Sequence, residues 1–399
     1  MRILISGASV AGPALAYWLH RYGHRPAIVE RAPAVRGGGA AIDFRGSALD
    51  VLERMGLLAE MRRHETGMGA MTLVDDAGAT LATLPPAAIS GDLEVLKSDV
   101  TQILYEATRD TTDYLFDNTI TALDQDDSGV RVTFEHGRPD TFDLVIGADG
   151  LHSTVRGLAF GPESRYVRHL GIYGTLFTTG NFLGLDHAGR MYNTAGRSAL
   201  AFTARDDSEL RVGLSFTAGN LDYDRRDRGR QERLVAEHFA GAGWEVPRLL
   251  EAMRTAEDFF FDSSGQVVMD SWSAGRVALL GDAAYCAAPT SGRGTSQALI
   301  GAYVLAGELA EAPDHATAFT AYERRLRDYV ELNQEQGRAA ARWFFEQSAE
   351  PPPRWPRTRC RSSSTREPLR TKVELFFDYT LRPCRTPWRS PWSPRGGWP

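Results

Sequence analysis

An acid at the end of a strand-like run, followed by a glycine-rich loop, gives the chain its first candidate for chemistry. The segment reads RVALLGDAAYCAAPTSGRGTSQAL, and its apolar start, Arg276–Leu280, predicts a short buried strand. Asp282 follows where a carboxylate can accept hydrogen bonds from sugar or ribityl hydroxyls. The loop with Pro289, Gly292 and Gly294 leads into a helix, whose N-terminal N–H groups attract an anion. An ordinary strand–loop–helix unit explains this pattern equally well.

A second glycine-rich turn, in a suitable strand–helix–strand context, lies in the first thirty residues. Arg2–Ser6 predicts an apolar strand, GASVAG follows at residues 7–12, a helix runs to about Tyr22, and Pro26–Glu30 predicts a second strand. A dinucleotide fingerprint requires this βαβ arrangement. The two segments together therefore favour nucleotide binding over the ordinary interpretation.

The residue types in this turn suit a pyrophosphate and a ribose. Gly7 permits the tight turn, and Gly12 lets the helix pack closely on the strand. Ser9 stands where the usual pattern has its second glycine, and its small side chain keeps the site open. Glu30 has the spacing expected of an acceptor for the ribose 2′-hydroxyl, which favours an adenosine diphosphate without a 2′-phosphate.

A third segment, DLVIGADGLHSTVR, combines a buried strand at Leu144–Ile146 with a turn at Asp149 and Gly150 and a short helix. The order and separation of the three segments resemble the three motifs of single-component FAD-dependent monooxygenases, the para-hydroxybenzoate hydroxylase-like family. The resemblance spans about residues 1–345. It implies an α/β fold in which a Rossmann-like FAD-binding domain is interleaved with a mostly antiparallel β-sheet substrate domain, followed by a C-terminal helix.

The resemblance also implies an activity. FAD would bind non-covalently, NADPH or NADH would reduce it, and O2 would add at flavin C4a to give a hydroperoxide. One oxygen atom would pass to a small aromatic substrate, phenolic or of polyketide or antibiotic type. No residue receives a catalytic role, because the flavin carries the chemistry, with Pro289, Gly292 and Gly294 near the ring. The implied cofactor-binding residues are Gly7, Ser9, Ala11, Gly12, Glu30, Arg31, Arg36, Asp43, Lys97, Asp149, Asp282, Pro289, Gly292, Gly294 and Thr295.

Several of these positions have particular or alternative explanations. Arg36 and Asp43 have the separation of an arginine and an aspartate in tetracycline-degrading members of the family. There the arginine is implicated in contact with the nicotinamide cofactor and the aspartate in contact with FAD. By composition alone, the glycine-rich segment that contains them is a surface loop. Lys97 stands where the family usually has an arginine that contacts FAD, and it keeps the charge without the planar fork; a surface lysine is the alternative. Asp149 is implied to support the pyrophosphate and nicotinamide docking. Tyr285 stands where many relatives have histidine.

The pattern changes between about Tyr166 and Gly265, where alternating segments predict an antiparallel sheet with one buried face. The expected substrate domain comprises residues 71–96 and 166–265, and the FAD-binding domain comprises 1–70, 97–165 and 266–315. A C-terminal helix is expected over 316–350. Tyr192, Phe202 and Phe216 are candidates for lining a substrate pocket, although such aromatic residues more often belong to the core.

Composition bounds the remaining possibilities. With 399 residues, the chain can build two sizeable domains, and its net charge of −6 gives no support to nucleic-acid binding. The three cysteines lack metal-ligand spacing, so no metal site is expected, and their sparse, odd number favours a reducing compartment. No apolar run reaches membrane-spanning length, and the N-terminus leads directly into a strand. We therefore expect a cytoplasmic monomer or weak homodimer.

Residues 351–399 differ from the rest of the chain. They contain ten of the twenty prolines and eleven basic but only three acidic residues, a composition that does not readily build a core. A basic interaction tail is one interpretation; aberrant sequence in place of a normal C-terminal helix is the favoured one. For the whole chain two other functions stay open: an FAD-dependent reductase or dehydrogenase without oxygen transfer, and a non-catalytic FAD-binding scaffold or redox sensor.

Overall fold

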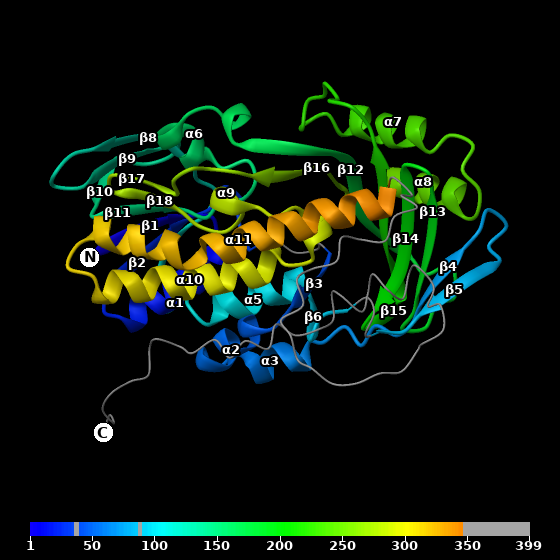
Figure 1. Ribbon diagram of the computed structural model, residues 1–399, viewed down its shortest axis with the longest axis horizontal. Helices are drawn as coiled ribbons and strands as arrows, with labels where there is room; N and C mark the ends of the chain where they lie inside the picture. The colour runs from blue at the N-terminus through cyan, green and yellow to red at the C-terminus, as the bar shows by residue number, and fades with distance from the viewer. Residues whose placement is uncertain (36–39, 87–89, 346–399) are drawn as a thin grey trace, which may run out of the picture.

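The computed structural model describes residues 1–35, 40–86 and 90–345. Its two largest sheets lie toward opposite ends of the molecule, and a long C-terminal helix, α11 (His315–Phe345), runs between them (Figure 1). Arg36 and the predicted tail at 351–399 lie outside the described residues. Within the described part, no helix is both long and apolar enough to cross a bilayer.

The six-stranded sheet forms because short apolar runs pair in parallel at its centre. This sheet and the helices packed against it are called the first half of the molecule. β1 pairs with β2 on one side and with β11 on the other, which is the arrangement expected of consecutive βαβ units. The side chains of β1 after Arg2 are buried, as in a sheet covered on both faces. The strand order is β17 (Ser273–Ala274), β18 (Val277–Leu279), β11 (Leu144–Gly147), β1 (Arg2–Ser6), β2 (Arg25–Val29) and β7 (Asp113–Leu115).

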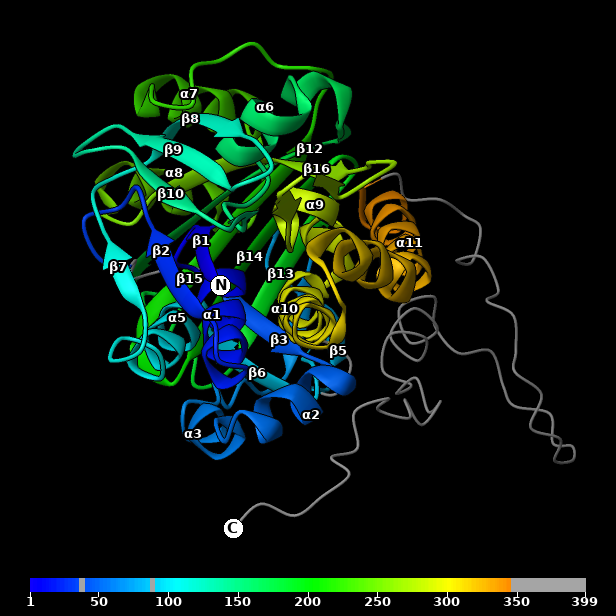
Figure 2. The same cartoon turned by 90° about the vertical axis from the view of Figure 1, so that its left-hand side faces the viewer.

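Helices pack against this sheet and against one another, as the view along α10 and α11 shows (Figure 2). α10 is buried over most of its length because its apolar side chains surround the whole helix. It lies between α1 and α11. The helices of this half, besides α11, are α1 (Ala11–Arg21), α2 (Ser47–Arg54), α3 (Leu58–Arg63), α5 (Lys97–Glu106), α6 (Thr154–Phe160), α9 (Asp282–Tyr285) and α10 (Gly294–Glu311), with short 3-10 turns at η1 (Glu163–Arg165) and η2 (Pro289–Ser291).

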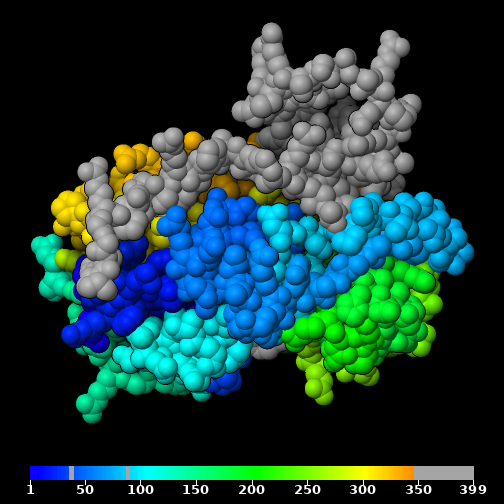
Figure 3. Space-filling model, turned by 90° about the horizontal axis from the view of Figure 1, so that it is seen from below, coloured from blue at the N-terminus to red at the C-terminus, as the bar shows by residue number. Residues whose placement is uncertain are grey.

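The second large sheet confirms the antiparallel pattern expected for the substrate domain. Its strands pair antiparallel except β13 with β4, which are parallel. α7 (Arg228–His238) and α8 (Val246–Thr255) cover one face, and the β4–β5 hairpin projects at the edge, as the space-filling view shows (Figure 3). The strand order is β16 (Phe260–Val267), β12 (Val167–Gly180), β15 (Asp206–Thr217), β14 (Arg197–Ala204), β13 (Gly189–Thr194), β4 (Met71–Val74) and β5 (Thr80–Leu84).

Two small sheets complete the fold, and one differs from expectation. β6 (Leu93–Leu96), expected with the substrate strands, pairs instead with β3 (Ala41–Phe44) in a separate antiparallel pair. The reason is that the register places Leu93 opposite Phe44, and both side chains join the core of the first half. The other small sheet contains β8 (Ile120–Gln125), β9 (Val130–Phe134) and β10 (Asp140–Phe142).

Candidate functional site

The turn between β1 and α1 has the close backbone approach that its glycines predict. Gly7 adopts φ +107°, and a Cβ there would lie 2.5 Å from the carbonyl oxygen of Ala148. A Cβ on Gly12 would lie 1.9 Å from the carbonyl oxygen of Gly7, so only glycine permits this packing. α1 begins at Ala11, directly after Ser9 and Val10. The helix N-terminus therefore stands at the end of β1, where an anion can bind its free N–H groups.

Glu30 lies at the carboxyl end of β2, beside this turn. Its Oε2 accepts a hydrogen bond from the backbone N–H of Ala8 at 2.8 Å, and its Oε1 accepts one from Ala32 at 2.9 Å. The backbone thus fixes the carboxylate next to the helix N-terminus. Arg31, the next residue, is exposed.

Asp282 and Lys97 come together although 185 residues separate them in the sequence. Asp282 opens α9 and is exposed, yet the protein around it raises the pKa of its carboxyl by desolvation, and the charge of Lys97 partly opposes that rise. Gly294 lies beside the same carboxylate, since a Cβ there would lie 3.7 Å from Asp282 Oδ1.

The loop between Asp282 and Gly294 contains an unusual backbone conformation. Ala288 has φ +71° and ψ 152°, a region that glycine alone adopts easily. Such a conformation costs roughly 1–3 kcal/mol and persists where the surrounding structure enforces it. Pro289 begins the turn η2, and Gly292 ends it in the left-handed conformation. α10 then starts at Gly294 and includes Thr295.

Asp149 is oriented by its own loop. Its carboxylate accepts hydrogen bonds from Ser153 Oγ at 2.5 Å and from the backbone N–H of Val155 at 3.1 Å, and burial raises its pKa. Nearby, Arg156 is fully buried and donates to the carbonyl oxygen of Ala283 in α9 at 2.9 Å. The third sequence segment therefore joins the other two through backbone and buried side-chain contacts.

Asp43 is held by neighbouring groups rather than exposed on a loop. Its Oδ2 pairs with Arg45 at 2.8 Å, and its Oδ1 accepts from the N–H of Gly91 at 2.6 Å. Across the β3–β6 pair stands Glu94, whose pKa burial raises to about 7, with the charge of Asp43 adding to the shift. Ser296 Oγ, in the first turn of α10, bonds the backbone N–H of Arg45 at 3.0 Å, which places β3 next to the start of that helix.

His152 connects the two halves of the molecule. Its Nδ1 lies 3.0 Å from a carboxylate oxygen of Glu163, and its Nε2 lies 3.2 Å from the carboxylate of Asp262 on β16. Burial opposes the charged ring, but these two carboxylates prevail and raise the pKa of His152. Arg225 also bonds Glu163, at 3.0 Å.

The contact between His152 and Asp262 identifies the face of the seven-stranded sheet that is turned toward the first half. Residues in register share a face, and alternate residues along a strand return to it. Gly174 pairs with Asp262, so Leu176, two residues along the same strand, shares that face. A largely apolar row crosses the sheet there: Leu176, Gly213, Leu200, Met191 and Leu73. The neighbouring row contains Thr178, Arg211, Phe202, Gly189 and Met71.

Two of the three pocket candidates lie on the opposite face, and this corrects the expectation. Tyr192 and Phe216 pack with side chains of α7 and α8; the Tyr192 hydroxyl bonds Asp76, and the Phe216 ring stacks on His238 at 4.0 Å. Phe202, in contrast, belongs to the face turned toward the first half and is partly buried. The physical reason is alternation, because the helices cover the face to which Tyr192 and Phe216 point.

No role was predicted from the sequence for four buried carboxamide side chains near the loop that precedes α10. Gln266, Gln297, Asn333 and Gln334 are between 1% and 6% exposed and lie between the loop, α10 and α11. The available signal was weak: Gln297 is a polar residue within an otherwise apolar helical pattern. Their partners are distant in the sequence, so the pattern did not indicate their role.

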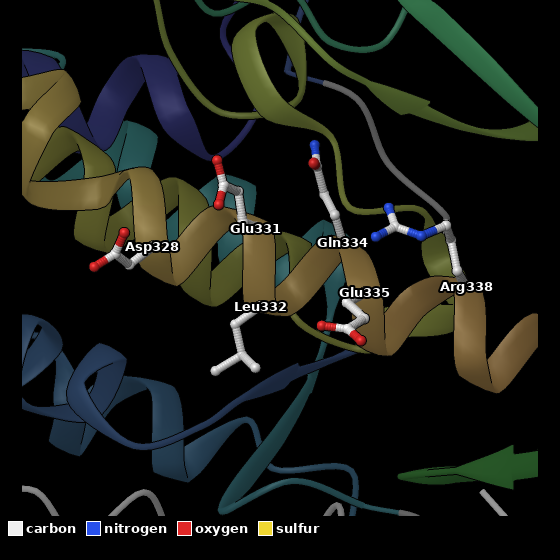
Figure 4. Close-up of a pocket in the computed structure, with 6 residues that line it drawn as sticks. All are labelled: Asp328, Glu331, Leu332, Gln334, Glu335 and Arg338. Carbon is white, nitrogen blue, oxygen red and sulfur yellow. The ribbon is translucent and has the colours of Figure 1, made fainter. Parts of the chain in front are cut away.

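These residues fit an adenine dinucleotide of the FAD type. The glycine turn, the α1 N-terminus and Glu30 match a pyrophosphate and ribose, and the neighbouring residues Asp282, Lys97 and Gly294 match a polar chain leading to a ring. A depression lies on α11, lined by Asp328, Glu331, Leu332, Gln334, Glu335 and Arg338 (Figure 4). Its lining includes three acids and no helix N-terminus, so it does not suit a phosphate.

Comparisons with known proteins agree with this site. The chain matches the FAD binding domain family over residues 1–342. It is 47% identical over 339 residues to an uncharacterized protein of Mycobacterium tuberculosis (strain CDC 1551 / Oshkosh), covering 83% of this chain and 91% of the relative. It is 37% identical over 343 residues to a flavin-dependent monooxygenase of Legionella longbeachae serogroup 1 (strain NSW150), covering 84% and 88%.

Solved structures give the same result. The tetracycline destructase Tet(55) is similar with a TM-score of 0.81 at 40% identity, over 86% of this chain and 89% of that chain. Family match, sequence identity and fold thus point the same way as the glycine turn and the group of Asp282, Lys97 and Gly294. The chain belongs to the FAD-binding-domain family, among its flavin-dependent monooxygenases.

Proposed function

We propose that the protein uses NADPH or NADH and O2 to hydroxylate an aromatic small molecule of polyketide or antibiotic type. The observation that carries this proposal is the 40% identity to a tetracycline destructase, combined with the close glycine turn before α1 and the Glu30 carboxylate that the backbone holds beside it. The apolar row through Leu176, Leu200 and Met191 supports an apolar, ring-containing substrate. The half-exposed Leu176, 36% accessible, gives such a ring a surface that excludes water.

Some residues are proposed to bind the cofactor, and others to exclude water from the substrate. Bound FAD supplies hydride acceptance and oxygen activation. Glu30 would hold the ribose, the N-terminus of α1 would bind the pyrophosphate, and Asp282 would accept hydrogen bonds from hydroxyls of the cofactor. Phe202 and the residues in register with it on the seven-stranded sheet would contact the substrate. Asp149 orients its own loop, and Lys97 supplies positive charge near Asp282.

The test is oxygen consumption and NAD(P)H oxidation by the FAD-loaded protein, with and without tetracycline or simpler phenols, together with mass spectrometry of the products. Substrate-stimulated consumption of both, and a product heavier by one oxygen atom, is the expected result. NAD(P)H oxidation that transfers electrons to the substrate without O2 uptake would instead establish a reductase or dehydrogenase. FAD binding without turnover on any of these compounds would favour a non-catalytic scaffold.

A further inference from the structure

Three buried glutamine side chains hold three successive carbonyl groups where α9 ends and the loop Cys286–Arg293 begins. In each case the side-chain amide N–H donates to a backbone oxygen. The glutamines are far apart in the sequence, so the fold alone brings them to this loop. The pairs are Gln297 with Tyr285 at 2.8 Å, Gln334 with Cys286 at 3.3 Å, and Gln266 with Ala287 at 3.0 Å.

The carboxamides also make further hydrogen bonds, which fix how each amide is turned. Gln334 Nε2 donates at the shorter distance of 2.7 Å to the carbonyl of Val267, so it joins β16 to the loop. Gln297 Oε1 accepts from Asn333 Nδ2 at 2.7 Å. Gln266 Oε1 accepts from Arg338 Nη1 at 2.8 Å, and its Nε2 also donates to the carbonyl of Gln334 at 2.6 Å. In a dry interior, a polar network whose groups are paired rigidifies what it binds. The loop is therefore held by side chains that have little freedom to rotate.

The three glutamines belong to three different parts of the fold. Gln297 lies on α10, Gln334 on α11, and Gln266 on β16 of the seven-stranded sheet. α11 lies directly against the loop, because a Cβ on Gly337 would be 2.2 Å from the carbonyl oxygen of Ala287. Gln334 and Arg338 point to the same side of α11 (Figure 4). The loop's position thus depends on both halves of the molecule and on the helix between them.

The loop held in this way is strained at Ala288, whose φ of +71° an L-residue rarely adopts. Such strain persists only where surrounding contacts enforce it. A trans peptide also points its N–H away from its carbonyl. Fixing the carbonyls of Tyr285, Cys286 and Ala287 therefore also fixes the directions of the N–H groups of the residues that follow each of them.

We propose that Gln266, Gln297 and Gln334 are positioning residues that set the loop Cys286–Arg293 against the flavin and so tune the flavin's spectrum and reduction potential. The proposal requires FAD binding, which the family establishes, and is independent of whether the protein hydroxylates a substrate. It assigns a role in flavin chemistry to side chains on the substrate sheet and the C-terminal helix, outside the three sequence segments.

The experiment compares Gln297→Met and Gln334→Met with a matched control, Gln231→Met, in the full chain. Gln231 is also buried, and its Nε2 also donates to backbone carbonyls, those of Arg225 at 2.9 Å and Asp224 at 3.4 Å, beside the far face of the substrate sheet. FAD affinity is measured by titration, the bound flavin by its visible absorption spectrum, and its reduction potential by equilibration with a reference dye.

We expect both loop variants to bind FAD about tenfold more weakly, and their FAD-loaded fractions to show a shifted visible band and a shifted potential. Gln231→Met should lower thermal stability and leave all three flavin properties unchanged. Wild-type spectra and potentials in both loop variants would overturn the proposal, because the glutamines would then serve stability alone.

A variant that fails to fold does not leave the proposal undecided. Asn333→Leu keeps the shape of the side chain and removes only the hydrogen bond to Gln297 Oε1. The same shift in the flavin band and potential is expected for it, smaller in size, and an unchanged flavin in this variant counts against the proposal in the same way. None of these measurements uses a substrate, so failure of the proposed hydroxylation leaves them interpretable.

Discussion

Asp282 is exposed at the start of α9, yet neighbouring protein groups raise the pKa of its carboxyl by desolvation, and the charge of Lys97 opposes that rise. Its carboxylate lies near Lys97 and Gly294, where a bound cofactor would replace the water. Burying a charge is unfavourable until hydrogen bonds compensate it. The residue therefore contributes little to the stability of the cofactor-free fold and more to the bound state.

Replacing Asp282 with alanine should weaken FAD binding by about 1–3 kcal/mol, because cofactor hydroxyls lose their acceptor. The thermal stability of the FAD-free protein should not fall, since a desolvated charge is removed. Titration with FAD and thermal unfolding measure the two effects. Asp258→Ala is the control: it removes an acceptor for Thr178 on the substrate sheet and should leave FAD affinity unchanged. Equal FAD affinity in the two variants would contradict the role of Asp282.

Gly294 is the second residue whose role is open to a direct test. It is the first residue of α10, and a Cβ there meets nothing closer than 3.7 Å, so neither backbone strain nor packing among the described residues demands glycine. What a side chain would obstruct is the approach of the flavin to the helix N-terminus. That N-terminus stabilises negative charge on reduced flavin by roughly 0.3–1 kcal/mol, and by up to about 2 kcal/mol when partly buried.

We therefore predict that Gly294→Val lowers the reduction potential of bound flavin and slows its reduction by NADPH, beyond any loss of FAD. Gly294→Ala should fold with wild-type stability, because its Cβ has ordinary space. Potentiometry on the FAD-loaded variants is the measurement. If Gly294→Val only lowers the melting temperature while the potential stays at the wild-type value, the glycine serves helix packing.

The sequence allowed the local geometry of single residues to be predicted where that geometry depends on short spacing, whereas their role in binding FAD stays a prediction. Gly7, Gly12 and Glu30 lie within one βαβ unit, so their geometry follows from a short stretch of chain. Gln266 and Gln334 depend on contacts with the loop that span 21 and 48 residues, and no local pattern indicates such a pairing. Residue types at motif spacing were thus predictable, whereas the groups that orient the loop were not.

At the scale of elements, the loop between α9 and α10 stores strain at Ala288. Ala288→Gly should raise the free energy of unfolding by about 1 kcal/mol, because glycine adopts φ +71° without steric cost; the greater freedom of glycine in the unfolded chain limits the gain. Chemical denaturation of the FAD-free protein measures it. Ala287→Gly, one residue earlier, is the control and should destabilise. A loss of stability in Ala288→Gly would show that the backbone is unstrained at this position.

The strands of the substrate sheet were predictable, but their orientation was not. Alternating side chains define two faces for β13, β14 and β15, and both faces contain aromatic or apolar residues. Which face α7 and α8 cover depends on the side of the sheet to which the chain crosses after β15. The alternation of side chains carries no information about that side. For this reason Tyr192 and Phe216 were assigned to the wrong face, whereas Phe202 lies on the face turned toward the first half.

At the scale of the whole molecule, two of the connections between its halves differ in chemistry. α11 reaches from the core around Tyr322 to β12, where Ala341 and Phe345 pack with Ile172. On another side, His152 lies between Glu163 of the first half and Asp262 of the substrate sheet. The first connection is mainly apolar and insensitive to pH, and the second is ionic. The ionic connection therefore contributes to the pH dependence of stability, and the apolar one does not.

The His152 cluster should give the protein a maximum of stability in mildly acidic solution. Despite the opposing effect of desolvation, Asp262 and Glu163 raise the pKa of His152, so its contribution is complete below the unfolded value of about 6.5 and is lost as pH rises through the higher folded value. Despite desolvation, His152 and Arg225 lower the pKa of Glu163 to about 2, so its contribution is complete above about 4.5 and is lost as pH falls toward 2. Both contributions are complete between about pH 4.5 and 6.5.

We predict that His152→Gln costs about 1 kcal/mol of unfolding free energy at pH 6 and less at pH 9, because partly exposed ion pairs contribute modestly. Denaturant unfolding across this pH range, at low and at high salt, measures the effect, and salt should reduce it at pH 6. His20→Gln, on the exposed face of α1, is the control and should leave the pH profile unchanged. A cost for His152→Gln that is equal at pH 6 and pH 9 would mean that the ring acts through packing, and the ionic connection between the halves would then contribute nothing.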